Sequence, residues 1–186
     1  TNFSDSLDPS SIVNAAWCVS RYGIGECLYR FDQQMQPQPY LADSVKSNDD
    51  NTEWTFHIRD GVKFSNGKEL TPSAVKKSIE YTFKQEEDGK GTAHPSQFLK
   101  YESIEADDES GNLTIKTSQA YADLSAVLAN PLFVIVDVDA DTDMADQPIG
   151  TGPYAVVKKN EGTSIEMEAN EHYWNGDVPY EKLNVI

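Results

Sequence analysis

Apolar residues recur at helical spacing near the start of the chain. Between residues 10 and 28 they predict an amphipathic helix with the packing positions Ile12, Ala16, Val19, Ile24 and Leu28. Gly23 and Gly25 weaken the second half of this helix, because glycine has more backbone freedom to lose on folding. The helix is therefore expected to be less stable toward residue 28.

A second helix is predicted to begin at Thr71, whose side chain would cap the backbone, with Pro72 in the first helical position. It continues to about Lys84, and its packing side consists of Val75, Ile79, Tyr81 and Phe83. A polar loop with glycines follows at residues 84–96. A short amphipathic helix is expected within residues 120–130.

Alternation of apolar and polar residues predicts several strands. Trp54, Phe56 and Ile58 alternate with polar neighbours, which gives one buried and one polar face within a hairpin-like region at residues 41–67. Other extended segments are expected at residues 27–32, 101–118 (two strands around a turn), 131–138, 154–160, 163–170 and 182–186. Interspersed strands and helices of this kind predict a mixed α/β fold.

The charge balance narrows the classes of partner. The 186 residues include 15 basic and 31 acidic side chains, for a net charge of -16. Such a surface disfavours nucleic acids and anionic membranes, and it suits a protein that attracts cationic or zwitterionic ligands. The sequence has no apolar run as long as a membrane span.

Two cysteines, Cys18 and Cys27, are nine positions apart in the predicted first helix. At about 1.5 Å of rise per residue their separation would exceed the reach of a disulfide. We therefore expect two free, largely buried thiols. Two cysteines at this spacing are also too few for a cysteine-based metal site.

Gly150, Gly152 and Ala155 fit the spacing G-x-G-x-x-G/A of a dinucleotide-binding loop. That loop must open a helix, whose free N–H groups bind the pyrophosphate. Here Pro153 removes a backbone donor and a β-rich run follows, so the segment is interpreted as a turn into a strand.

Neither a metal site nor an enzyme site is predicted. His57, His94 and His172 are scattered, and the alternate acids of residues 137–143 lack the glycine and glutamate that a calcium loop requires. The chain has no G-x-S-x-G nucleophile motif, and neither cysteine has a histidine placed beside it. Asp107 and Asp108 lie in a predicted turn, where they would be hydrated. We expect no enzymatic activity and no resident cofactor.

Five segments, in order, match a known family. "LDPS", "LADSV", "WTFHIRDGVKFSNGKELTPSAVKKSIE", "PIGTGPY" and "NEHYWNGDVPYEKL" resemble the solute-binding proteins of peptide, nickel and oligopeptide ABC importers, that is, extracellular solute-binding protein family 5. The resemblance implies a two-lobed periplasmic-binding-protein-like fold (type II, class C) that closes over its ligand. Family members are more than twice as long, so residues 1–186 are expected to be the N-terminal portion of lobe one, without the second lobe.

The stretch "VSRYGIGECLYRFD" is similar to an Arg-x-Gly-x-x-Glu-x-Leu signature of the nickel and metallophore branch, although Cys27 stands where that branch often has threonine. The resemblance therefore favours nickel or a nickel chelate as the transported ligand, with a dipeptide or oligopeptide as the alternative. A metal already wrapped in a small chelator would need no protein histidine.

In this family the segment after Leu-Asp-Pro faces the ligand cleft. The resemblance therefore implies a ligand-binding set of Asn14, Ala15, Trp17, Arg21 and Tyr22. A guanidinium beside aromatic rings could pair with a ligand carboxylate and stack on it. Two alternatives stay open: Trp17 could belong to the core, and Arg21 could pair with Glu26 or another local acid.

The expected function is that of an extracytoplasmic binding component that delivers its ligand to the membrane permease of an ABC importer. Its partners would be the permease subunits and a small ligand, and the protein would be a monomer, either in a periplasm or held by a lipid anchor. The isolated chain is expected to bind weakly. A rival interpretation is a non-transport extracellular protein-interaction module, which would show a flat apolar patch in place of a cleft with aromatic walls.

Overall fold

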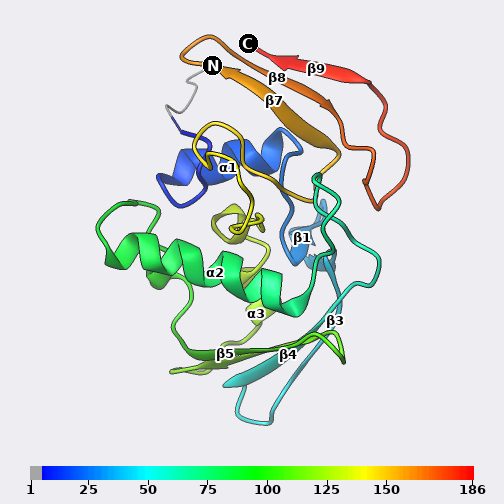
Figure 1. Ribbon diagram of the computed structural model, residues 1–186. Coiled ribbons are helices and arrows are strands. Elements are labelled where there is room, and N and C mark those ends of the chain that lie inside the picture. The colour runs from blue at the N-terminus through cyan, green and yellow to red at the C-terminus, as the bar shows by residue number, and fades with distance from the viewer. Residues whose placement is uncertain (1–5) are drawn as a thin grey trace.

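A computed structural model describes residues 6–186. The mixed α/β fold expected from the sequence is confirmed. The two larger sheets lie at opposite ends of the molecule with a helix packed on each, and a two-stranded sheet, β1-β2, accompanies them (Figure 1). The helices are α1 (Val13–Arg21), α2 (Pro72–Glu87) and the single-turn α3 (Leu124–Val127), with short 3₁₀ turns η1 (Pro95–Gln97) and η2 (Pro131–Phe133). The strands are β1 (Tyr29–Phe31), β2 (Pro37–Pro39), β3 (Ala42–Ser47), β4 (Glu53–Ile58), β5 (Tyr101–Asp107), β6 (Asn112–Thr117), β7 (Tyr154–Asn160), β8 (Ser164–Ala169) and β9 (Lys182–Val185).

The larger sheet is antiparallel, with the strand order β3-β4-β6-β5. Strand β4, one of its two inner strands, buries Trp54, Phe56 and Ile58, as the alternation predicts, and leaves the residues between them partly exposed. The expected hairpins at residues 41–67 and 101–118 are the pairs β3–β4 and β5–β6. Most buried apolar side chains of the protein gather between this sheet, α2 and the loops above it.

Helix α2 begins as predicted. The Thr71 hydroxyl oxygen accepts a hydrogen bond from the backbone N–H of Ala74 at 3.2 Å, and Pro72 occupies the first turn. The helix buries Val75 and Ile79 against the sheet. It runs through Glu87, three residues beyond the predicted end, because nothing in residues 85–87 breaks a helix.

The smaller sheet, β7-β8-β9, covers α1 at the other end of the molecule (Figure 1). Val156, Ile165 and Met167 pack there with Val19 and Cys18 in a second, smaller core. The segment Gly150–Gly152 turns the chain into β7, and no helix follows it. Its interpretation as a structural turn, and not a nucleotide loop, is therefore confirmed.

Helix α1 is shorter than predicted and ends at Arg21. Gly23 adopts a φ of +74°, in the left-handed region, and the N–H groups of Ile24 and Gly25 both bond back to the carbonyl of Val19. Residues 22–28 therefore form a loop and a short extended segment, so the expectation of a helix as far as residue 28 was wrong. Cys18 and Cys27 are free and buried, as expected.

Residues 131–138 are buried but do not form the predicted strand. They begin with the 3₁₀ turn η2 and then make only single bridges, between Ile135 and Glu26 and between Val136 and Gly150. The apolar run signals burial correctly. It cannot tell a strand from an irregular buried segment, because the backbone of this segment faces loops and not a neighbouring strand.

Candidate ligand-binding site

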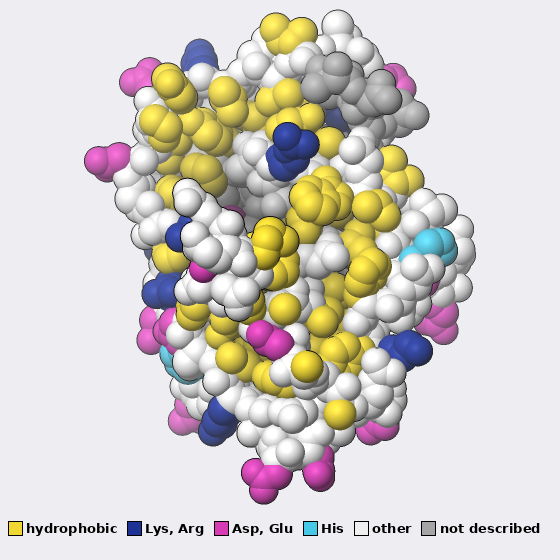
Figure 2. Space-filling view, turned by 180° about the vertical axis from the view of Figure 1, so that it is seen from behind, with side chains coloured by type: hydrophobic (Ala, Val, Ile, Leu, Met, Phe, Trp, Pro, Cys, Tyr) yellow, Lys and Arg dark blue, Asp and Glu magenta, His cyan; other side chains and the backbone are white. Residues whose placement is uncertain are grey.

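A hollow of about 490 Å³ opens between α1 and the β1–β2 hairpin; we call it the α1 hollow. Figure 2 shows the face on which hydrophobic side chains gather around this opening, with most acidic side chains at the edge of the view. The residues that line it are Trp17, Ser20, Gly23, Gly25, Glu26, Cys27, Tyr29, Arg30, Phe31, Met35, Tyr40, Ala129, Pro131, Pro153 and Tyr173. They come from segments far apart in the chain.

Helix α1 presents part of the predicted ligand-binding set to solvent. Asn14, Trp17 and Arg21 lie on its exposed face, and Trp17 lines the hollow with 47% of its surface exposed. Ala15 is fully buried, and Tyr22 is half-buried beside Cys18. The structure thus places Trp17 in the hollow and Asn14 and Arg21 beside it on the same helix, and it offers no exposed side chain at Ala15.

The sequence left open whether Trp17 belongs to the core and whether Arg21 pairs with Glu26. Trp17 does not belong to the core, since nearly half of its surface is exposed. Within residues 6–186, the ion pairs described do not join Arg21 to Glu26. The carboxylate of Glu26 has other partners.

Glu26 lies at the base of the hollow with only 6% of its surface exposed, and four side chains donate hydrogen bonds to it. Its Oε1 accepts from the hydroxyls of Tyr40 at 2.7 Å and Tyr173 at 3.2 Å. Its Oε2 accepts from the indole N–H of Trp174 at 2.8 Å and from the hydroxyl of Thr151 at 2.9 Å. We call these five residues the Glu26 cluster.

The electrostatics of the cluster reflect its burial. Removal from water raises the pKa of the Glu26 carboxyl, and the four hydrogen bonds oppose that rise without cancelling it. A buried carboxylate is costly unless its oxygens are hydrogen-bonded. Here each carboxylate oxygen accepts two hydrogen bonds. The cluster therefore fixes the rings of Tyr40 and Tyr173 where they border the hollow.

Thr151 reaches Glu26 because its two flanking glycines let the backbones touch. A Cβ on Gly150 would lie 2.1 Å from the carbonyl oxygen of Ile24, and a Cβ on Gly152 would lie 2.2 Å from that of Gly23. The N–H of Gly152 also bonds to the Ile24 carbonyl at 3.0 Å. The Gly-Thr-Gly turn is therefore pressed against the loop that carries Glu26.

Asn170 brings the two remaining aromatic residues into the cluster. Its side-chain amide donates to the carbonyl of Gly152 at 2.8 Å, and its side-chain oxygen accepts from the N–H of His172 at 2.9 Å. This turn directs Tyr173 and Trp174 toward Glu26. The segments "PIGTGPY" and "NEHYW" thus meet at one carboxylate.

Two of the three arginines stack on aromatic rings of the cluster. The guanidinium carbon of Arg30 lies 4.5 Å from the centre of the Tyr40 ring. That of Arg59 lies 5.0 Å from the Trp174 ring centre, and its Nε donates to the Tyr40 carbonyl at 2.9 Å. Such cation–π contacts contribute about 0.5 to 2 kcal/mol, more as water is excluded.

The histidines and acids do not form a metal site among residues 6–186. His57 pairs with Asp43 at 2.9 Å, His94 with Glu86 at 3.1 Å and His172 with Glu171 at 3.6 Å, in three separate places. Cys27 borders the α1 hollow, but burial, and to a lesser extent the nearby charge of Glu26, raises the pKa of its thiol to about 12. The thiol is therefore protonated and is a poor metal ligand.

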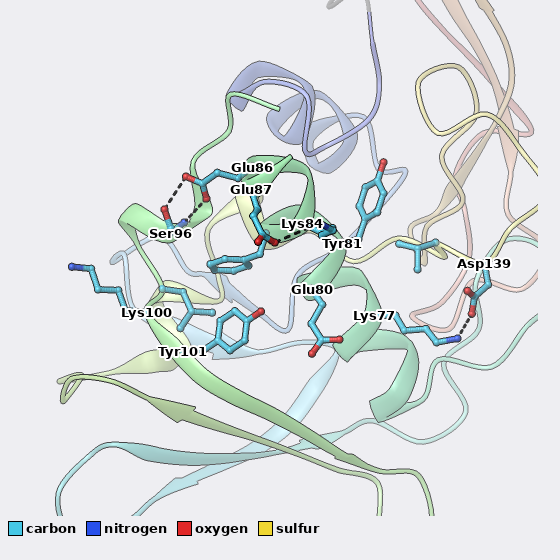
Figure 3. A pocket seen from close by; sticks show the side chains of 13 residues that line it. Lys77, Glu80, Tyr81, Lys84, Glu86, Glu87, Ser96, Lys100, Tyr101 and Asp139 are labelled. Carbon is cyan, nitrogen blue, oxygen red and sulfur yellow. Dashed lines mark hydrogen bonds and ion pairs between the residues drawn. The ribbon is translucent and has the colours of Figure 1, made fainter. Parts of the chain in front are cut away.

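A larger, open hollow of about 1040 Å³ lies between α2 and β5 (Figure 3). Several of its charges already have partners within the protein: Lys77 pairs with Asp139, and Glu86 accepts hydrogen bonds from Ser96. Its aromatic residues Phe83 and Tyr101 pack edge to face against each other. This surface lacks polar groups that converge on a ligand position, whereas the α1 hollow has an arginine and several aromatic rings around one opening.

Sequence reasoning missed Arg30, Tyr40 and Tyr173 as residues of the site. Tyr173 was visible as part of the motif "NEHYW", but nothing in the sequence connects it to a position 147 residues away. Arg30 lies in β1 and Tyr40 directly follows β2, so the pairing of these two strands brings them together only in the fold. No helix among residues 6–186 is both long and apolar enough to cross a membrane.

The fold and this site define a binding protein with an open, aromatic-lined pocket. Residues 36–186 match the family model of the bacterial extracellular solute-binding proteins, family 5 (middle part). The chain belongs to this family, as its five segments indicate. The family is one of binding proteins and not of enzymes.

Named relatives agree with this assignment. The nickel-binding protein NikA of Staphylococcus aureus (strain NCTC 8325 / PS 47) is 32% identical over 169 residues, which cover 89% of this chain and 32% of NikA. A crystal structure of S. aureus NikA in complex with Ni(L-His)2 superimposes with a TM-score of 0.82 at 28% identity, over 98% of this chain and 37% of that one. The dipeptide-binding protein DppE of Bacillus subtilis (strain 168) is 28% identical over 95% of this chain and 36% of its own length.

The chain thus spans about a third of the length of the curated relatives it matches. Over 98% of its length it has the fold of the matching part of S. aureus NikA.

Proposed function

We propose that this chain is the N-terminal portion of lobe one of an extracytoplasmic solute-binding protein that delivers nickel, as a small chelate, to the permease of an ABC importer. The observation that carries the proposal is the α1 hollow, where Trp17, Tyr40, Tyr173 and Arg30 surround one opening. Aromatic walls with a few placed polar groups are typical of small-ligand sites. The names of the NikA relatives support nickel as the metal.

The binding mechanism follows from the shape of the site. The α1 hollow is open on one side, so this chain alone would contact only part of a ligand. A second lobe, contributed by sequence outside this chain, would close over the ligand and stabilise the closed form. The closed form would then dock on the permease. The isolated chain is expected to bind with millimolar or weaker affinity, since it lacks the enclosing contacts.

A chelate suits this hollow better than a bare metal ion. The described residues bring no three metal-ligating side chains together, and the Cys27 thiol is protonated. A nickel ion whose coordination is filled by small-molecule ligands needs only stacking surfaces and hydrogen-bond donors from the protein. Trp17, Tyr40 and Arg30 offer both.

A peptide is the second candidate ligand, because DppE is similar over nearly the whole chain. The same hollow could hold a short peptide by its carboxylate and one side chain. The rival interaction-module interpretation is less well supported, since the exposed apolar residues Trp17, Phe31 and Met35 surround a hollow and do not form a flat patch.

The test is a series of thermal midpoints of the intact gene product, purified without added metal. Ligands that bind only the native state must raise the midpoint. We expect nickel with L-histidine to raise it and short peptides to leave it unchanged. A rise with peptides alone would transfer the protein to the peptide-binding branch, and no rise with any of these compounds would overturn the proposal.

A further inference from the structure

The chain has only three arginines, Arg21, Arg30 and Arg59, and they are not spread evenly over the fold. Arg30 and Arg59 both stack on rings of the Glu26 cluster, and Arg21 ends the helix that carries Trp17. In a chain of net charge -16, two of the three planar cations thus lie on the rings of one cluster. Arginine is the residue whose fork of N–H groups matches a carboxylate in geometry.

Of these arginines, Arg30 has the position of a ligand anchor. It lines the α1 hollow, whereas Arg21 and Arg59 do not. Its side chain is exposed, and among residues 6–186 the described ion pairs leave its guanidinium without a carboxylate. Its described contact is the face of the Tyr40 ring. That contact orients the guanidinium and uses none of its N–H donors.

The ring under Arg30 is itself held in place. The hydroxyl of Tyr40 donates a hydrogen bond to the Glu26 carboxylate at 2.7 Å, and the backbone carbonyl of Tyr40 accepts one from Arg59. The Tyr40 ring packs edge to face on the ring of Trp174, with the ring centroids 5.3 Å apart. Glu26 is the acid that lines the hollow, and both of its oxygens already accept hydrogen bonds. Glu26 thus holds Tyr40, and Tyr40 in turn positions the Arg30 guanidinium. The described residues that line the hollow include no free acid to neutralise the Arg30 charge.

We propose that Arg30, stacked on Tyr40 beside Trp17, is the anchor for a carboxylate of the bound ligand. This inference rests on the proposed function and adds the chemical group, a carboxylate, by which the site would recognise its ligand. The carboxylate can come from an amino acid that chelates nickel or from the C-terminus of a peptide. In both cases the guanidinium binds the carboxylate through two parallel N–H donors while its face stays on the tyrosine ring.

Histidine and histamine provide the matched probes, because they differ only in the carboxylate and both chelate nickel through an imidazole and an amine. Titration calorimetry on the intact gene product would compare nickel–histidine with nickel–histamine. A second pair, a dipeptide and its C-terminal amide, tests the peptide source of the carboxylate. The wild-type protein is expected to prefer the carboxylate member of one pair by at least about tenfold.

Three variants then identify the anchor. Arg30→Gln should abolish that preference by weakening only the carboxylate member, and Arg30→Lys should restore it in part because the charge stays while the fork is lost. Lys46→Gln removes one exposed charge on β3, away from the hollow, and should change nothing. The unfolding midpoint of each free variant shows whether it is folded.

The outcomes separate the two proposals. If wild-type protein binds neither pair, the proposed function fails and the anchor with it. If it binds, but Arg30→Gln weakens both members of a pair equally or neither of them, the function stands and the anchor assignment is overturned. A selective loss on Arg21→Gln in place of Arg30→Gln would assign the carboxylate to the end of α1.

Discussion

The indole N–H of Trp174 donates a hydrogen bond of 2.8 Å to the carboxylate of Glu26, 148 positions earlier in the chain. This contact joins the loop after α1 to the segment before β9. Thr151 and Tyr40 reach the same carboxylate from two further segments. The Glu26 cluster therefore explains why segments so far apart in the sequence form one site: each supplies a donor to the same buried acid.

The first prediction concerns the removal of that acid. Glu26→Ala leaves four buried or half-buried donors without their acceptor, so the free energy of unfolding should fall by about 3 kcal/mol. Urea unfolding measures this change. The control is Glu102→Ala, which removes an exposed carboxylate on β5 and should cost less than about 0.5 kcal/mol. Equal losses in the two variants would contradict a structural role for Glu26.

The second prediction concerns pH. Burial raises the pKa of Glu26 above its ordinary value of 4.5, so the folded protein binds this proton more tightly than the unfolded chain. Between 4.5 and the raised value, the contribution of Glu26 to the free energy of unfolding falls as pH rises. Relative to Glu26→Gln, the wild-type protein should gain stability when the pH is lowered from neutral to 4.5.

Urea unfolding of both proteins across this pH range checks the sign. The variant has no group that titrates at this position, so other carboxyls cancel in the difference between the two proteins. If acidification instead made the wild-type protein less stable relative to Glu26→Gln, the hydrogen bonds would outweigh burial and lower the pKa of Glu26.

The third prediction tests the close approach at the Gly-Thr-Gly turn. Gly152→Ala places a Cβ 2.2 Å from the backbone oxygen of Gly23, where no side-chain movement can relieve the clash. We expect a loss of about 3 kcal/mol in the free energy of unfolding. Gly162→Ala serves as the comparison, because its Cβ meets no atom within 4 Å and only its φ of +63° is unfavourable, which costs about 1 kcal/mol. A larger loss at Gly162 would exclude this explanation of the turn.

The fourth prediction separates binding from stability at Trp17. Trp17→Ala should weaken the binding of nickel–histidine by about tenfold, because the ring forms one wall of the hollow. The free energy of unfolding should change by less than about 1 kcal/mol, since 47% of the side chain is exposed. Trp54→Ala removes a side chain that is 6% exposed and should cost about 3 kcal/mol or more. If Trp17→Ala lowered stability without changing affinity, its role would be packing.

Much of the fold can be predicted from local patterns. The Thr71–Pro72 start of α2, the buried face of β4 and the turn before β7 each depend on residues within one segment. The two errors arise where the outcome depends on neighbours in space. The end of α1 is decided by Gly23 and the segment packed against it, and residues 131–138 lack a partner strand.

The site is less predictable than the fold. Trp17 could be placed at a cleft because the family resemblance identifies the segment that faces it. Arg30 could not be placed there from the sequence. Its role depends on the Tyr40 ring beneath its guanidinium and on the lack of a carboxylate partner among the described residues, and both are visible only in the three-dimensional structure. The five segments, in their order along the chain, indicated the family without indicating that two of them, which carry Thr151 and Trp174, meet at Glu26.

The most direct test of the account is the position of nickel in a crystal of the intact gene product grown with nickel and L-histidine. Data collected at the nickel absorption edge locate the metal without reference to the rest of the density. The account predicts a single strong anomalous peak in the α1 hollow, with the chelate between Trp17 and Arg30. A peak in the hollow between α2 and β5, or no peak at either position, would contradict it.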